Sequence, residues 1–168
     1  PVLSKMGGAQ WDRVKSKASK SIRELAERLL KVYAEREITP GIAFDKDNIM
    51  QREFEDSFPY IETPDQLTAI QKIKEAMEKP QPMDMLLCGD VGFGKTEVAM
   101  RAVFKCVVSG YQAMVLVPTT VLSQQHYKNF VKRMEPFGVR VAVLNRFVSA
   151  KEKRVILQKL AAGELDVI

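Results

Sequence analysis

Residues 89–96 have the sequence Gly89-Asp90-Val91-Gly92-Phe93-Gly94-Lys95-Thr96, which matches the pattern G-x-x-x-x-G-K-[ST]. In such a loop, successive backbone N–H groups surround the phosphates of a nucleotide. The lysine reaches the terminal phosphate oxygens, and the threonine hydroxyl binds Mg²⁺. The glycines let the backbone approach the phosphates without an intervening Cβ. The sequence therefore predicts a nucleoside triphosphate site that extends from Gly89 to Glu97.

The segments that flank this loop support the prediction. Met85-Leu86-Leu87-Cys88 is a short apolar run that indicates a buried strand, and residues 97–104 indicate a helix. A strand, a loop and a helix in this order direct the positive end of the helix at an anion. A simple turn before a helix is the alternative, but it explains Lys95 poorly because a cation there opposes the helix dipole.

The composition is that of a soluble globular protein. The 168 residues are 46% hydrophobic and 28% charged, and no apolar run is long enough to cross a membrane. The only cysteines, Cys88 and Cys106, lack metal-ligand spacing, which favours a reduced, cytoplasmic setting without a structural metal. The net charge of +5 permits a nucleic-acid partner but does not require one.

Downstream of the loop, apolar runs alternate with helical patterns. We expect strands at residues 113–117, at 139–144 and from 165 onward, with helices at 120–134 and 149–162. Such alternation implies a parallel sheet flanked by helices. The expected fold class is therefore α/β. Because the last expected strand only begins at the end of the chain, we expect an incomplete domain within a longer protein.

A long amphipathic helix is expected before this domain. Between Trp11 and Glu37, apolar residues recur at steps of three and four, while the opposite face is basic. The basic face fits a contact with nucleic acid, but the solvated face of a connector helix is the more common explanation. Residues 1–10 are expected to form a loop that contains Gly7-Gly8, and residues 44–60 are expected to be irregular.

A further helix is expected to begin after Thr63, with Pro64 at its first position and Gln66 three residues after the cap. Gln66 has two interpretations, helix capping and recognition of an adenine edge by its side-chain amide. The residues alone do not decide between them. The nearby Phe58-Pro59-Tyr60 segment is a candidate wall for an adenine pocket, or ordinary core.

Hydroxyl groups follow the second expected strand at its carboxyl end, where open α/β sheets bind ligands. Thr119 and Thr120 are candidates to hold phosphates, including those of nucleic acid, and helix capping is the alternative. Gln124 lies about one turn further. The single histidine, His126, has no ligand partner at metal spacing. Hydrolysis also needs a carboxylate near Mg²⁺, and Asp166, at a strand start, is not assigned that role.

The chain resembles the bacterial transcription-repair coupling factors, a family of superfamily 2 DNA translocases. The segments that carry the resemblance are Phe58-Pro59-Tyr60, Thr63-Pro64-Asp65-Gln66, residues 89–99 and residues 117–126. The resemblance covers nearly the whole chain. It implies that residues 1–10 end a polymerase-interacting region, that 11–53 form a linker helix and connector, and that 54–168 begin a RecA-like, helicase-type ATP-binding domain. Leu144-Asn145-Arg146-Phe147 departs from the family, which more often has Ser-Arg-Phe there.

The resemblance implies an ATP-dependent translocase on double-stranded DNA that displaces stalled RNA polymerase and recruits excision-repair proteins through further domains. The implied cofactors are ATP and Mg²⁺, with Lys95 and Thr96 as catalytic residues and Thr96 as the Mg²⁺ ligand. Gln66 would read adenine. The DNA-backbone contacts would be Thr119, Thr120 and Gln124. Because the family's acidic motif would lie beyond Ile168, we expect no hydrolysis by this segment alone.

Three alternatives stay open at this point. A RecG-like fork-remodelling DNA helicase shares the phosphate loop and the Pro-Thr segment. A non-catalytic interaction module would use residues 11–33 to dock a partner and the loop only as an anion site. A small-molecule kinase would also use the phosphate loop, but the Pro118-Thr119-Thr120 segment argues against it.

Overall fold

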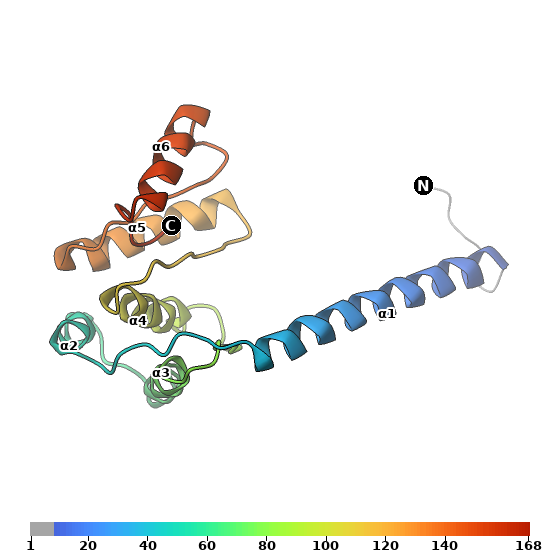
Figure 1. Ribbon diagram of the computed structural model, residues 1–168, viewed down its shortest axis with the longest axis horizontal. Coiled ribbons are helices and arrows are strands. Elements are labelled where there is room, and N and C mark those ends of the chain that lie inside the picture. Colours follow the sequence, from blue (N-terminus) through green and yellow to red (C-terminus); the bar gives the residue numbers. More distant parts are fainter. Residues whose placement is uncertain (1–8) are drawn as a thin grey trace. The chain divides into compact units, whose positions relative to one another are not determined.

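The computed structural model describes residues 9–168 (Figure 1). The expected loop at residues 1–10, with Gly7-Gly8, lies outside the described residues except for Ala9 and Gln10. These two begin a helix, so the loop prediction is wrong for them. The chain divides into two compact units between Gly41 and Ile42. Its helices are α1 (Ala9–Ile38), α2 (Ile49–Asp56), α3 (Pro64–Met77), α4 (Lys95–Val108), α5 (Thr120–Met134), the 3-10 helix η1 (Glu135–Phe137) and α6 (Ala150–Ala161).

Helix α1 confirms the long amphipathic helix that the sequence predicts. Its apolar positions, which include Trp11, Ile22 and Leu25, are all exposed. Two exposed ion pairs at i,i+4 spacing, Lys20–Glu24 and Lys31–Glu35, lie along it and contribute little to stability. No helix in the part of the chain that the structure describes is both long and apolar enough to cross a membrane.

Helix α2 lies within residues 44–60, so the prediction of irregular structure there is wrong. Asn48 caps this eight-residue helix by accepting a hydrogen bond from the backbone N–H of Gln51 at 2.9 Å. Phe54 is fully buried and stacks on Phe104 of α4 with ring centroids 4.1 Å apart. A short helix with two buried residues gives a weak periodic signal, and its packing against α4 stabilises it.

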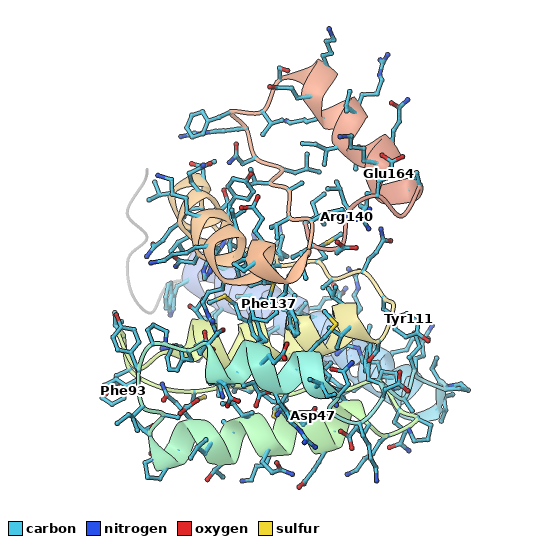
Figure 2. All side chains as sticks on the ribbon, turned by 90° about the vertical axis from the view of Figure 1, so that its left-hand side faces the viewer. Asp47, Phe93, Tyr111, Phe137, Arg140 and Glu164 are labelled. Carbon is cyan, nitrogen blue, oxygen red and sulfur yellow. The ribbon has the colours of Figure 1, made fainter. Side chains whose placement is uncertain are left out.

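Helix α4 occupies the centre of the second unit, with α2 and α3 on one side and α5 on the other (Figures 1 and 2). Met100 and Phe104 belong to one apolar cluster, together with residues of α2 and α5 and the last segment of the chain. Val98 belongs to a second cluster, with the buried residues of α3. A helix that contributes to two clusters is fixed in both position and rotation. Because α4 begins within the phosphate loop, the end of that loop is fixed with it.

A third face of α4 is charged and buried. Glu97, Arg101 and Lys105 are spaced four residues apart, so they lie on one stripe of the helix, and they are only 6%, 3% and 1% exposed. Buried charges are tolerated when ion pairs and hydrogen bonds satisfy them. The partners of this stripe therefore determine how the neighbouring segments attach to α4.

Lys105 holds the segment before α2. Its ammonium donates to the carboxylates of Asp47 at 2.9 Å and Glu78 at 2.8 Å, and to the backbone carbonyl of Asp45 at 2.6 Å. Asp47 also accepts from Lys74 of α3 at 2.6 Å. Burial alone would raise the pKa of the Asp47 carboxyl, but the hydrogen bonds from Lys74 and Lys105 outweigh it and hold the pKa below its ordinary value of 3.8.

Arg101 extends the network toward the phosphate loop. Its guanidinium donates to Glu62 and, at 3.1 Å, to Glu97. Burial, which would lower the pKa of Arg101, is outweighed by Glu62 and Glu97, so the pKa is raised. Glu55 of α2 lies 3.9 Å from Arg101 and 2.6 Å from Lys74, so it joins the two halves of the network.

The expected helices after the loop are confirmed, whereas the strands are not formed as expected. Within residues 9–168 the only β-structure is a pair of isolated parallel bridges, in which Val167 pairs with Ala113 and with Val141. The strand expected at 85–88 is not confirmed, because this segment takes part in no bridge and Leu86 is 87% exposed. An apolar run becomes a strand only when a neighbouring segment satisfies its N–H and C=O groups.

The Asp47 carboxylate gives the second unit a defined acid sensitivity. Because its folded pKa is lowered, it contributes stability that is present above pH 3.8 and is lost as the pH falls through the folded pKa. We expect Asp47→Asn to lower the free energy of unfolding at neutral pH by about 2 kcal/mol, because two lysines lose a charged partner. The variant should also lose less stability on acidification. Denaturant unfolding at a series of pH values measures both effects.

The matched control is Asp56→Asn, which removes an exposed carboxylate at the end of α2. It should leave both the neutral stability and the acid sensitivity near those of the unsubstituted protein. Identical pH profiles for Asp47→Asn and the unsubstituted protein would contradict the role of Asp47.

Candidate nucleotide-binding site

The phosphate loop ends where α4 begins, and glycine makes this junction possible. Gly94 is the N-cap of α4 and has a φ of 71°, in the left-handed region that other residues rarely adopt. Gly92 has a φ of 88°. Gly94 has no side chain to cap α4, and the N–H of Glu97 donates to the Gly94 carbonyl at 2.9 Å. The N–H groups of the first two helix residues and the positive end of the helix dipole are therefore left for an anion.

The Lys95 side chain lies along the loop. Its ammonium donates to the backbone carbonyls of Gly89 at 2.6 Å and Asp90 at 2.7 Å. A Cβ added at Gly89 would lie 3.6 Å from the Lys95 side chain, in van der Waals contact. The loop therefore surrounds a cation, as a site for a polyphosphate requires. Thr96, the predicted Mg²⁺ ligand, follows in the first turn of α4 and is half-buried.

Gln66 connects the loop to α3. Its Oε1 accepts from the backbone N–H of Thr63 at 2.8 Å, and the Thr63 hydroxyl accepts from the N–H of Gln66, so the capping box that the sequence predicts is confirmed. Its Nε2 donates to the carbonyl of Phe93 at 3.0 Å. A Cβ at Gly94 would lie only 2.4 Å from this Nε2. Recognition of adenine by Gln66 stays a prediction.

A cavity of about 690 Å³ lies beside the loop, within the size range of small-molecule sites. Its walls come from the end of the phosphate loop, the Phe58–Ile61 segment, the start of α3 and the last turns of α5. Phe58 and Tyr60 meet edge to face with centroids 5.5 Å apart. Figure 2 shows Phe93 and Tyr111 at opposite ends of α4, and the cavity lies at the Phe93 end. The proposed adenine wall and the phosphate loop thus line one cavity.

Glu97 lies beside the loop, but its carboxylate is bound by two arginines. It accepts from Arg101 at 3.1 Å and from Arg133 of α5 at 2.9 Å. The side chain is buried and lies at the wall of the cavity. Its observed contacts orient α4 against α5, and a nucleotide contact by Glu97 stays a prediction.

The candidate DNA-contact residues lie at the start of α5, away from the nucleotide cavity. The Thr119 hydroxyl caps the helix by accepting from the N–H of Leu122 at 3.2 Å. Thr119 and Thr120 line a separate cavity of about 340 Å³, and the exposed Gln124 lines a third. The structure confirms capping by Thr119, and the DNA contacts stay predictions.

Asn145 and Asp166, which the sequence also singles out, have defined partners. Asn145, where the chain departs from the family pattern, donates to the Ser123 hydroxyl of α5 at 3.1 Å. The Asp166 carboxylate accepts from both the backbone N–H and the guanidinium of Arg140, at distances from 2.7 to 2.9 Å. These hydrogen bonds lower the pKa of Asp166. Asp166 is thus part of an ion pair with Arg140.

Sequence reasoning missed Arg133, which lines the nucleotide cavity and contacts both the end of α2 and the start of α4. A weak signal was present. Arg133 lies three residues after Phe130 and next to Met134, both of which are buried on the inner face of α5. An arginine within an inner-face pattern needs a buried partner, but the pattern does not identify that partner.

The loop, the cavity beside it and the surrounding helices define an ATP-binding domain of the RecA-like helicase class. Residues 63–168 match the DEAD/DEAH box helicase family, and the chain belongs to this family. It is 49% identical over its whole length to the transcription-repair-coupling factor of Bacillus subtilis (strain 168), and equally to that of Mycobacterium bovis. The chain spans only 14% of the length of these relatives.

A solved structure of RecG bound to a three-way DNA junction is also similar. It superposes with a TM-score of 0.76 at 37% sequence identity, over 82% of this chain and 19% of the RecG chain. This similarity supports the RecA-like helicase fold of the second unit.

The contact between Gly94 and Gln66 predicts that the loop does not tolerate a side chain at residue 94. We expect Gly94→Ala to weaken nucleotide binding about tenfold or more, because the added Cβ displaces Gln66 and the left-handed backbone becomes strained. Titration with a fluorescent ATP analogue measures the effect.

Gly110→Ala is a matched control at the other end of α4. Gly110 has a φ of 86°, but nothing lies within 4 Å of its added Cβ. This variant should show the cost of backbone strain as lower stability, with nucleotide affinity retained. Equal nucleotide affinity in the two variants would refute the specific role of the Gly94–Gln66 contact.

Proposed function

We propose that the full-length protein is an ATP-dependent double-stranded DNA translocase of the transcription-repair coupling type. The observation that carries this proposal is the 49% identity to transcription-repair-coupling factors along the entire chain. The phosphate loop supports it, because a motor of this class needs a triphosphate site at the start of a helix. The protein would work in the cytoplasm.

The proposed cofactors are ATP and Mg²⁺. The backbone N–H groups of residues 89–97 and the ammonium of Lys95 would hold the phosphates, and the Thr96 hydroxyl would bind Mg²⁺. Gln66 and the Phe58-Pro59-Tyr60 segment would bind the adenine. The lining of one cavity by Gln66, by the Phe58-Pro59-Tyr60 segment and by the phosphate loop supports this assignment.

We further propose that Thr119, Thr120 and Gln124 contact the DNA backbone. Hydroxyl and N–H groups at the start of a helix suit phosphate oxygens. The segments at 113–117, 139–144 and 165–168 would belong to a parallel sheet whose carboxyl edge carries these residues. The parallel bridges at Val167 support that arrangement, and further chain in the full-length protein would complete the sheet.

We also propose partners and a domain organisation, which the similarity to transcription-repair-coupling factors supports. Residues 1–10 would end a polymerase-interacting region, 11–53 would connect it to the motor, and 54–168 would begin the motor domain. RNA polymerase stalled on double-stranded DNA would be displaced, and excision-repair proteins would be recruited through other domains. ATP hydrolysis would require motifs outside this segment.

A RecG-like helicase that remodels DNA forks is the second candidate, favoured by the superposition on RecG. The lower identity of 37%, over 82% of the chain, makes it the weaker one. The two candidates differ in substrate, because a coupling factor acts on stalled RNA polymerase and a RecG-like enzyme acts on branched DNA.

The proposed function predicts that Lys95 is essential in the full-length protein. We expect Lys95→Ala to lower ATP turnover about 100-fold or more, because the terminal phosphate loses its positive partner. Displacement of stalled RNA polymerase should be lost with it, while binding to polymerase is kept. Steady-state ATPase assays and a polymerase-displacement assay measure the two activities.

The matched control is Lys72→Ala, which also removes one positive charge but at an exposed position of α3. This variant should leave both ATP turnover and polymerase displacement unchanged. A Lys95→Ala protein that still displaced polymerase would argue for a non-catalytic interaction module. Fork regression by the unsubstituted protein without any polymerase displacement would favour the RecG-like alternative.

A further inference from the structure

Arg133 is the point at which α5 attaches to the nucleotide site. Its guanidinium binds the Glu97 carboxylate with two nitrogens, Nη2 at 2.9 Å and Nε at 3.3 Å. Glu97 lies two residues after Lys95, in the first turn of α4. An arginine that holds a carboxylate with two N–H groups fixes orientation as well as distance. The last turn of α5 is therefore oriented against the first turn of the phosphate-loop helix.

The same guanidinium also holds the segment that forms the other wall of the cavity. Nη1 donates to the Ser57 hydroxyl at 2.6 Å, and Nη2 donates to the carbonyl of Phe54 at 3.1 Å. The guanidinium carbon lies 4.5 Å from the centroid of the Phe54 ring and 5.7 Å from that of Phe58. Phe58 lines the nucleotide cavity. Arg133 thus contacts both the loop side and the aromatic side of this cavity.

The opposite end of α5 carries the proposed DNA contacts. Thr119 is its N-cap and Thr120 its first residue, so the helix leads from the carboxyl edge of the proposed sheet to the nucleotide cavity. At 1.5 Å per residue, these threonines lie about 20 Å along the helix axis from Arg133. A helix of this length transmits displacement at one end to the other, because its backbone hydrogen bonds resist bending.

We propose that Arg133 is a positioning residue that couples the nucleotide site to the DNA contacts through α5. This inference rests on the proposed function. A displacement of the phosphate loop or of the Phe58 segment shifts the residues that Arg133 contacts. This shift in turn displaces the last turn of α5, which carries Arg133. By thermodynamic reciprocity, nucleotide then alters DNA affinity by the same factor by which DNA alters nucleotide affinity.

We expect that Arg133 can be replaced without unfolding the protein, so that the loss of coupling can be measured. Glu97 keeps Arg101 as a partner when Arg133 is replaced, so its buried charge is not left unpaired. Arg133 itself is 14% exposed, so a neutral polar replacement reaches solvent at its tip. Lysine cannot reproduce the planar fork that serves Glu97, Ser57 and the Phe54 carbonyl together.

The test compares DNA affinity with and without nucleotide in the full-length protein. Fluorescence anisotropy with labelled double-stranded DNA gives the dissociation constant, with and without a non-hydrolysable ATP analogue. We expect Arg133→Gln to reduce the effect of nucleotide on DNA affinity about tenfold, within the usual range of coupling between sites. DNA-stimulated ATP hydrolysis should fall in parallel.

Lys128→Gln is the matched control. It removes one positive charge from an exposed residue of α5 that does not line the nucleotide cavity. Its nucleotide effect on DNA affinity should equal that of the unsubstituted protein. An unchanged nucleotide effect in Arg133→Gln, or an equal loss in Lys128→Gln, overturns the inference.

A second variant keeps the test decisive if Arg133→Gln fails to fold. Arg133→Lys retains the charge and should show a partial loss of coupling at a Tm close to that of the unsubstituted protein. Full coupling in Arg133→Lys, with Arg133→Gln unfolded, overturns the inference. If the unsubstituted protein shows neither DNA-stimulated hydrolysis nor any nucleotide effect on DNA affinity, the proposed function itself fails and this inference fails with it.

Discussion

The buried stripe of Glu97, Arg101 and Lys105 on α4 is the constraint on which the second unit depends. An isolated buried charge costs several kcal/mol, so each of these groups requires its partners in place. The partners come from the segment before α2, from α2 itself, from the residues that flank α3 and from α5. Apolar clusters give the unit its packing, whereas this network specifies which segment lies where. The phosphate loop gains its fixed position from the same helix.

The sequence predicts helix caps and the phosphate loop because residues close together in the chain determine both. The cap of α3 at Thr63 was predictable because a capping box is a pattern of neighbouring residues, and α6 begins with the same pattern at Ser149. The loop from Gly89 to Thr96 was readable for the same reason, since its backbone geometry depends on glycines within it. Helix capping by Gln66 follows from spacing alone, whereas its bond to Phe93 joins segments 27 residues apart.

Features that depend on distant partners were not predictable in this way. The apolar run at residues 85–88 has the composition of a strand, but no neighbouring segment pairs with it in the described part of the chain. Helix α2 was missed because its stability comes from the stack of Phe54 on Phe104, fifty residues away. Arg133 was missed for a related reason, since its partners Glu97 and Ser57 lie on other elements.

The position of Val167 between two other segments has a consequence for synthesis of the chain on the ribosome. Ala113 and Val141 each pair with Val167, so these two earlier segments are joined only through a later one. The backbone N–H and C=O groups of these two segments therefore stay unpaired until the residues around position 167 have left the exit tunnel. Helices close locally and early, whereas pairing over such sequence distances is slow. The nascent chain therefore exposes unpaired edges at residues 113 and 141 until residue 167 emerges, and unpaired strand edges are prone to aggregation.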